Sequence, residues 1–299
     1  MNLLCAQGLQ GAANLDIDKC LATLDEWAEK VRRDTESRLP AFHANPAKYE
    51  NSEAKFRAIT LVLTLQEEYR VHYDPASIGN WDFSNSSTIF IHGLLGDKRT
   101  GTCTSLPVLC TAIGRRLCYP MKIVLAKSHV LCRWDNGREK FNIETCCGAG
   151  MDIRDDAYYM KWPQEITKAD LIDGYLLKSL TATETLGSFM NNRFGCLADT
   201  KRFSEAQIAG AWANYLMPGS KLQTLAQLSL VDYQMKEIAA KEFNVTGQAP
   251  GYTLQVQYDG RDDVFVWGRR PRPGLEIPAY RPPKRDPMDP TPRIESPFN

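Results

Sequence analysis

The sequence predicts an α+β protein in which a cysteine-bearing helix packs on an antiparallel sheet and an all-helical region follows. Three observations indicate this class. Apolar residues recur at three- and four-residue steps in the first 120 residues, as in amphipathic helices. Short β-type runs follow between residues 121 and 144, around the turn dipeptide Asn136-Gly137. Beyond residue 158 the helical period returns, so helices and strands are segregated along the chain.

Three helices are expected before the strands. Residues 16–33 carry an apolar stripe behind Asp16, which suits a helix cap, and residues 52–69 predict a second core helix. Residues 82–102 are rich in Ser, Asn and Gly and predict a loop. A third helix is expected over residues 104–117, where Pro107 is tolerated because it falls in the first turn.

The strands are expected over residues 121–126, 130–134 and 138–144. A two-residue turn at Asn136-Gly137 places Asp135 opposite Arg138. The same antiparallel register then places His129 directly opposite Glu144 on one face of the sheet. Asn142, which this register places opposite Leu131, is the diagonal second choice for orienting the imidazole.

The second half of the chain predicts mainly helices, over residues 168–180, 183–197, 204–216 and 220–243. Residues 252–267 predict a hairpin around Asp259-Gly260, and residues 269–299 are Pro-rich and irregular. We therefore expect three regions: a core with N-terminal helices over 1–157, a helical region over 158–245, and a short hairpin with a Pro-rich tail over 246–299.

The overall composition argues against nucleic-acid binding, membrane insertion and secretion. Lys plus Arg and Asp plus Glu both number 36, so no basic field is expected for nucleic acid. No window has the roughly 18 apolar residues that a membrane span needs, and no signal peptide is evident. Nine cysteines lack the even, regular spacing of a secreted disulfide framework, which favours a cytoplasmic protein. The oligomeric state is not predicted.

Cys103, His129 and Glu144 supply a thiol, an imidazole and a carboxylate in chain order. These groups suit a cysteine nucleophile, its base and the residue that orients the base. A helix N-terminus and a neighbouring imidazolium both favour a thiolate, and Cys103 is expected at a helix N-terminus. Gly101 lets the backbone approach a substrate, and the Cys103 amide is a candidate oxyanion donor. The alternative is that Cys103 is a buried small apolar residue.

The sequence offers weaker support for a role of other polar residues in the active site. His92 and Thr102 are candidates for lining the cleft, although a structural loop histidine is the stronger interpretation of His92. Zinc ligation by His129, Cys132, Cys146 and Cys147 is disfavoured, because Cys132 falls on the opposite strand face and Cys146-Cys147 does not match ligand spacing. Cys110, Cys118 and Cys132 are interpreted as buried structural residues. We expect neither a metal nor a cofactor.

Together these residues resemble a known family. The runs Gly101–Pro107, Gly114–Pro120 and Phe141–Glu144, with the pair Ser128-His129, are similar to the transglutaminase-like superfamily, particularly its bacterial SirB-type branch. The resemblance is specific over residues 82–150. Residues 16–31 resemble the N-terminal helix of that branch more weakly, and residues 191–218 resemble its tetratricopeptide-type helical tail.

The resemblance implies a papain-like α+β core with a Cys-His-Asp triad. Cys103 and His129 match the nucleophile and base, whereas Glu144 stands where the family usually has Asp and Thr145 where a Pro commonly follows. The expected function is cysteine-dependent acyl transfer at an amide bond, by a protease, an amidase or a transglutaminase. The alternative is a catalytically weak or inactive interaction module. Either way, the expected substrate or partner is a protein or peptide.

Overall fold

The computed structural model describes residues 1–77, 82–146 and 151–221, together with 234, 257–258 and 261–262. The chain divides into two compact units, Met1–Gln227 with Ile294–Asn299, and Leu228–Arg293. The expected boundary at residues 157 and 158 does not coincide with this division. In the second unit, β7 (Gln257–Tyr258) pairs antiparallel with β8 (Arg261–Asp262), as expected of a hairpin centred on Asp259-Gly260.

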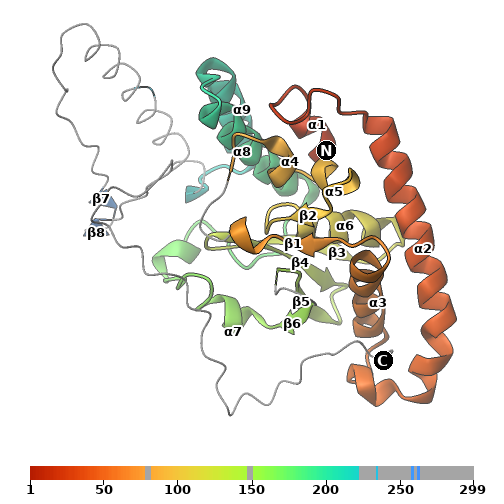
Figure 1. Ribbon diagram of the computed structural model, residues 1–299. Coiled ribbons are helices and arrows are strands. Elements are labelled where there is room, and N and C mark those ends of the chain that lie inside the picture. Colours follow the sequence, from red (N-terminus) through yellow and green to blue (C-terminus); the bar gives the residue numbers. More distant parts are fainter. Residues whose placement is uncertain (78–81, 147–150, 222–233, 235–256, 259–260, 263–299) are drawn as a thin grey trace, which may run out of the picture. The chain divides into compact units, whose positions relative to one another are not determined.

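The first unit begins with helices, and α2 and α3 pack against each other (Figure 1). The short α1 (Asn2–Ala6) was not expected. The next two helices, α2 (Ile17–Ala44) and α3 (Glu53–Glu67), were expected. A 3₁₀ turn, η1 (Pro46–Tyr49), connects α2 to α3. The caps are Asp16, which accepts the Lys19 N–H at 2.9 Å, and Ser52. The expected end of α2 at residue 33 is too early, because Thr35 and Phe42 continue its buried stripe.

Residues 82–102, expected as a loop, contain two one-turn helices and a short strand. These are α4 (Ser86–Ile89), α5 (His92–Leu95) and β2 (Thr100–Gly101). β2 pairs parallel with β1 (His72–Tyr73), so that Tyr73 lies beside Gly101, and the 3₁₀ turn η2 (Pro75–Ser77) follows β1. The next helix, α6 (Leu106–Arg116), confirms the third expected helix, with Pro107 in its first turn. It contacts α2 and α3 as well as the sheet, and therefore lies between them.

The sheet has four antiparallel strands in the order β3-β4-β5-β6 (Figure 1). Their bounds are β3 (Met121–Ala126), β4 (His129–Asp135), β5 (Lys140–Glu144) and β6 (Asp152–Arg154); the first three were expected. On the face that carries Val124 and Leu131, the sheet packs against Tyr159 and Ile166, just after β6. Tyr159 ends the one-turn helix α7 (Asp156–Tyr159).

The helix expected over residues 168–180 is absent from the described chain, which has only the 3₁₀ turn η3 (Ala169–Leu171) in that range. The physical reason is that this segment runs along the free edge of β3. Leu177 N–H donates to Leu125 O at 2.8 Å, and Leu180 N–H donates to Ile123 O at 2.9 Å. A helix would withdraw these groups from the sheet edge.

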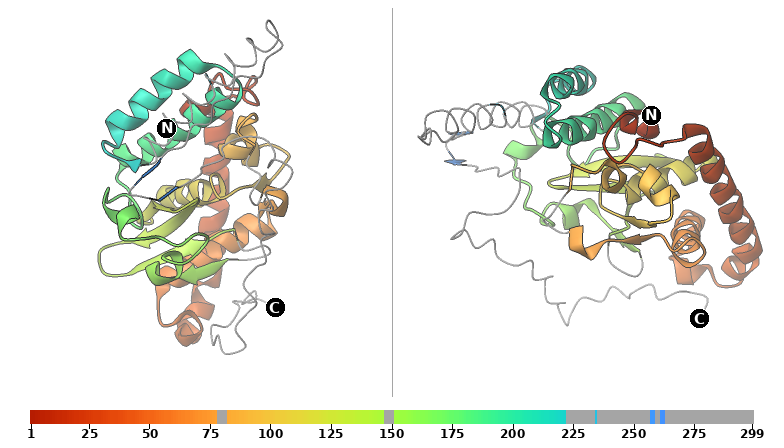
Figure 2. Two further views of the ribbon diagram at one scale, coloured as in Figure 1. Left: turned by 90° about the vertical axis from the view of Figure 1, so that its left-hand side faces the viewer. Right: turned by 45° about the horizontal axis from the view of Figure 1, so that its top comes forward.

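The next two helices match their expected positions. They are α8 (Ala182–Asp199) and α9 (Phe203–Leu216), which pack side by side (Figure 2). α8 starts with a capping box between Thr181 and Glu184. The expected helix over residues 220–243 lies almost entirely outside the described residues, as does the Pro-rich tail.

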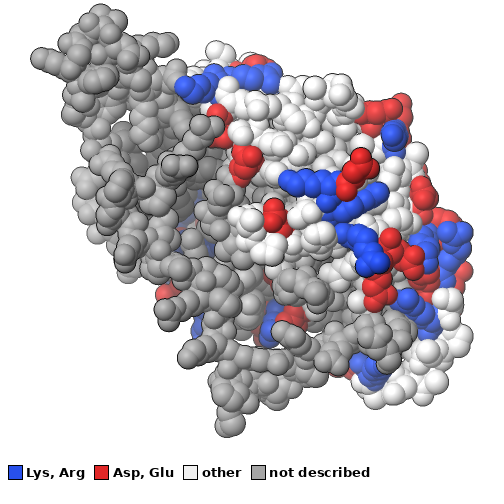
Figure 3. Space-filling view, in the orientation of Figure 1, with Lys and Arg blue, Asp and Glu red and all other residues white. Residues whose placement is uncertain are grey.

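Charged side chains of both signs alternate on the face of the molecule that Figure 3 shows. Lys and Arg lie next to Asp and Glu over the part of this face where Figure 1 places α2. Within α2, the Lys30 Nζ lies 2.7 Å from the Asp34 Oδ1. In the described part of the chain, no helix has the length and apolarity required to cross a membrane.

Candidate active site

The hairpin that carries the candidate histidine and carboxylate has a different register from the expected one. The loop between β4 and β5 has four residues, and Asp135 pairs with Lys140 rather than with Arg138. The cause is the Asn136 side chain, whose Oδ1 accepts the N–H groups of Arg138 and Glu139 at 2.8 and 2.7 Å. This favours a wider loop than the two-residue Asn-Gly turn.

The predicted contact between His129 and Glu144 nevertheless forms. The register differs from the expected one by two residues, and an even shift keeps every side chain on the same face of the sheet. Continued register places Glu144 opposite Leu131, so that it lies diagonally from His129. The His129 Nε2 lies 2.7 Å from the Glu144 Oε2. The residue pair and face were predicted correctly, but the direct cross-strand position was wrong.

Cys103 lies in a turn just before α6, where the chain already coils. Leu106 N–H donates to Thr102 O at 3.0 Å. Thr102 fixes this turn, because its N–H donates to the Ser105 Oγ at 3.0 Å and its hydroxyl donates to Thr88 O at 2.9 Å. Among the described residues the Cys103 N–H donates to no backbone acceptor.

The Cys103 thiol is also close enough to His129 to raise the pKa of the imidazole. Because Nε2 is engaged by Glu144, Nδ1 is the ring nitrogen left for the thiol. The three residues are buried, with exposed fractions of 6% for Cys103, 7% for His129 and 3% for Glu144.

Burial and charge act in opposite directions on this pair. Burial alone would lower the pKa of His129, but the Glu144 carboxylate and the contacts with Glu144 and Cys103 outweigh it and raise this pKa to about 10. Burial alone would raise the pKa of Glu144, and the His129 charge and hydrogen bond reverse that effect and lower it. The pair is therefore an imidazolium and a carboxylate at neutral pH.

The structure adds site residues that sequence reasoning missed. Tyr159, fully buried on α7, donates its hydroxyl to the Glu144 Oε2 at 2.9 Å, and the Cys146 N–H donates to the Glu144 Oε1 at 2.8 Å. Trp162 packs edge-on against His129, with 4.9 Å between ring centroids. Burial, with smaller contributions from the nearby Cys103, Cys146 and Glu144, raises the pKa of Tyr73 to about 12. No spacing rule links Tyr73, Tyr159 or Trp162 to the hairpin, whereas Cys146 follows Glu144 by only two residues.

Two of the candidate residues have other roles. Asn142 does not orient His129. Its side chain bonds to the buried Arg133 at 2.6 Å and to Asp156 at 2.9 Å, because the four-residue loop places it opposite Arg133. His92 bonds to Gly11 O at 3.2 Å and lies near the Ser86 hydroxyl, as expected of a structural histidine.

Close packing requires a glycine at position 101. A Cβ there would lie 2.8 Å from Leu94 Cδ2 and 2.9 Å from both Leu106 Cγ and Ser105 Oγ. Gly101 therefore lets β2 fit closely against α5 and the start of α6, which keeps the turn of Cys103 in place.

The cysteines are only partly as expected. Cys132 is buried on the strand face opposite His129, next to Cys110 of α6, which is also buried. Cys118 is exposed instead of buried, because the chain leaves α6 through a left-handed residue there, with φ 59°. Cys146 lies close to His129 and Glu144. Cys147 lies outside the described residues.

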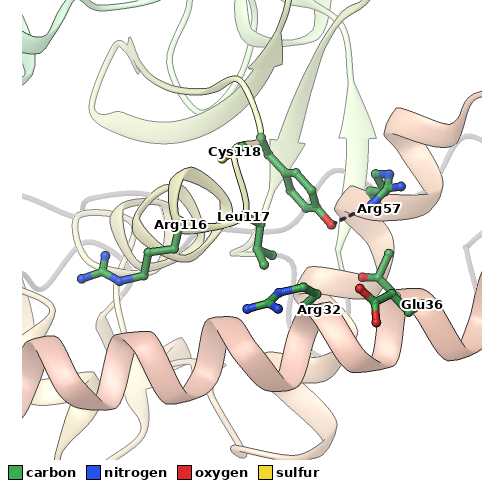
Figure 4. A pocket seen from close by; sticks show the side chains of 8 residues that line it. Arg32, Glu36, Arg57, Arg116, Leu117 and Cys118 are labelled. Carbon is green, nitrogen blue, oxygen red and sulfur yellow. Dashed lines mark hydrogen bonds between the residues drawn. The ribbon is translucent and has the colours of Figure 1, made fainter.

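A polar pocket of about 320 Å³ lies elsewhere, between α2, α3 and the end of α6 (Figure 4). Three arginines line it, but each already has a carboxylate partner. Arg116 bonds to Asp25 at 2.6 Å, Arg57 pairs with Glu53, and Arg32 pairs with Glu29. None of the residues grouped around His129 lines this pocket, so it is separate from the candidate active site.

Replacing Tyr159 by Phe removes one donor from the Glu144 carboxylate and little else. A hydrogen bond to a charged group contributes about 1.5–3 kcal/mol. We expect Tyr159→Phe to slow the acylation of Cys103 by an amide-directed electrophile about tenfold, because His129 is held less firmly. Tyr175→Phe is the matched control, since it removes a hydroxyl bonded to Pro218 O. Equal rates for the two variants would contradict the positioning role of Tyr159.

The stability of the protein should depend on pH through His129. Its pKa is higher in the folded state, at about 10, than the ordinary 6.5. Its stabilising contribution is therefore complete below about pH 6.5 and is lost as the pH rises through 10. As the pH rises from about 6.5 to about 10, the free energy of unfolding should decrease in both proteins. We expect the decrease to be larger in wild type than in Glu144→Gln, by on the order of 3 kcal/mol. Urea unfolding at each pH measures this difference, and parallel curves would contradict it.

Comparisons of the chain with family models, with curated proteins and with solved structures return no match. The function is therefore argued from the geometry of the site.

Proposed function

We propose that this protein is a cysteine-dependent acyl-transfer enzyme that acts on an amide bond. The observation that carries the proposal is the position of His129, which contacts both the Cys103 thiol and the Glu144 carboxylate. Thiol, imidazole and carboxylate in contact are the parts of an activated cysteine nucleophile.

In the proposed mechanism, Cys103 attacks the amide carbonyl as the thiolate, with its proton held on His129. The Cys103 N–H stabilises the oxyanion that forms. His129 then gives the proton to the departing amine, and the thioester remains on Cys103. Water or a second amine attacks this thioester, His129 accepts the proton of the attacking group, and the thiolate is restored. Glu144 holds the imidazole in orientation and stabilises its charged form throughout.

The order of these residues in the chain, and their resemblance to the transglutaminase-like superfamily, also support the proposal. Glu144 differs from the Asp usual in that family by one methylene. The Tyr159 hydroxyl and the Cys146 N–H fix both oxygens of this longer side chain. They make Glu144 suitable for the orienting role without the Pro that commonly follows.

The test is selective acylation of Cys103. The full chain is treated at neutral pH with an electrophilic amide-directed probe, and every labelled cysteine is located by peptide mass spectrometry. We expect Cys103 to be labelled before the exposed Cys118, although it is much less accessible. Labelling that follows exposure, with Cys118 first and Cys103 last, would sink the proposal.

A second candidate function is a non-catalytic interaction module. Two observations favour it: the burial of all three site residues, and the exposed apolar side chains Ile208, Trp212 and Tyr215 on α9. The Cys103→Ala variant separates the two functions. A module keeps its full biological effect after this change, whereas an enzyme loses it with the fold intact.

A further inference from the structure

We infer that the site binds one Zn²⁺ ion through His129, Glu144 and Cys146. One ring nitrogen of His129, one carboxylate oxygen of Glu144 and the Cys146 sulfur all lie within 4.8 Å of one another. They come from the start of β4, the end of β5 and the residues just after β5. From the sequence, His129 and Cys146 were weighed as zinc ligands but not together with Glu144, which the sheet brings to His129 from 15 positions away.

The donor atoms suit zinc in kind and in spacing. Thiolate, imidazole and carboxylate are zinc ligands, whereas Ca²⁺ and Mg²⁺ prefer oxygen alone. Zinc bonds of about 2.0–2.3 Å in a tetrahedron set ligand atoms about 3.3–3.6 Å apart. The His129 Nε2 and Glu144 Oε2 are 2.7 Å apart and would separate slightly, while the sulfur would move inward.

The surroundings of the three residues support a bound metal. A ligating carboxylate is normally held by further hydrogen bonds, and Glu144 receives them from Tyr159 and from the Cys146 N–H. His129 and Glu144 are buried, whereas Cys146 is partly exposed. Binding releases the proton of the Cys146 thiol and the proton shared by His129 and Glu144. Three protein ligands leave a fourth position for water.

The consequence for the enzyme is inhibition, a step that rests on the proposed function. His129 bound to zinc cannot hold the proton of Cys103 or pass it to the leaving amine. Zinc therefore acts as a reversible inhibitor that occupies the base and the orienting carboxylate while leaving the fold intact.

The first test uses the wild-type, full-length chain without bound metal. Cysteines are alkylated with iodoacetamide, with and without an equivalent of Zn²⁺, and the labelled peptides are quantified. We expect zinc to protect Cys146 at least tenfold and to leave Cys118 unchanged. No protection of Cys146, or equal protection of Cys118, overturns the site.

The second test measures zinc affinity by competition with a chromophoric chelator. We expect one ion per chain and at least about a 100-fold weaker affinity in Cys146→Ser, which keeps the backbone N–H to Glu144. Cys118→Ser is the matched control and should bind as wild type does. An unchanged affinity in Cys146→Ser, or an equal loss in Cys118→Ser, overturns the assignment of ligands.

The same samples separate the two proposals. If zinc protects Cys146 but the metal-free protein is not acylated at Cys103, the zinc site stands and the proposed enzyme does not. If Cys103 is acylated and zinc leaves Cys146 exposed to alkylation, the enzyme stands and the zinc site is refuted. Acylation of Cys103 that zinc leaves unchanged or accelerates would refute inhibition.

Discussion

Replacing His129 by Gln should reduce the rate constant for acylation of Cys103 by on the order of 10³-fold or more. Two effects combine. Gln cannot carry the proton of the thiol, so the thiolate loses its ion-pair partner, and no group remains to pass a proton to the leaving amine. The expected loss far exceeds the change for Tyr159→Phe, because that variant keeps both functions.

The control for this variant is His43→Gln. His43 is exposed at the C-terminal end of α2, so its replacement tests the loss of an imidazole without disturbing the site. His129→Gln must retain the circular dichroism spectrum of wild type for the comparison to hold. A folded His129→Gln protein that acylates as fast as His43→Gln would exclude His129 as the base.

The largest expected loss of stability is for Arg133→Met. Arg133 is completely buried on β4, and its guanidinium bonds to Asn142 on β5, to Leu177 O at 3.1 Å and to Asp156 at the start of α7. It thus ties the segment that carries Tyr159 to the sheet. Removing one partner of a buried ion pair costs about 3–5 kcal/mol. Asp156 keeps a second partner, Lys140, so we expect a loss at the lower end of this range. Urea unfolding of Arg133→Met should show a free energy of unfolding about 3 kcal/mol below that of wild type.

Arg138→Met provides the matched control for Arg133. Arg138 lies in the exposed loop of the same hairpin, where surface substitutions usually change stability by less than about 0.5 kcal/mol. Similar midpoints for Arg133→Met and Arg138→Met would mean that the buried network adds little stability. At low urea, where Arg133→Met is still folded, a reduced rate of Cys103 acylation would further show that Arg133 supports the position of Tyr159.

The parts of the fold that sequence patterns predicted are those fixed by local chemistry. Asp16 and Ser52 cap helices because their side chains satisfy free N–H groups near them in the chain, and Pro107 fits only a first turn. The helix expected over residues 168–180 did not form because the edge of β3, some 50 residues earlier, takes its backbone groups. Tertiary hydrogen bonds of this kind leave no local pattern.

The His129 and Glu144 pair could be predicted because it depends only on which face of the sheet each side chain occupies, and an even shift in register leaves the face unchanged. An error of two residues in register left His129 and Glu144 on one face, so the pair was found despite the wrong loop. Asn142 shows the limit, because the same error gave it the wrong neighbour. Tyr159 was missed for another reason. Its contact with Glu144 depends on how the chain after β5 folds back, which no spacing in the sequence encodes.

We propose that His129 activates Cys103 and that Glu144 holds His129 in place. The direct test is the rate of Cys103 alkylation by iodoacetamide at neutral pH, in wild type and in His129→Ala. We predict that the buried Cys103 of wild type reacts faster than the exposed Cys118, and that His129→Ala loses this advantage. Equal rates for Cys103 in the two proteins would contradict this proposal.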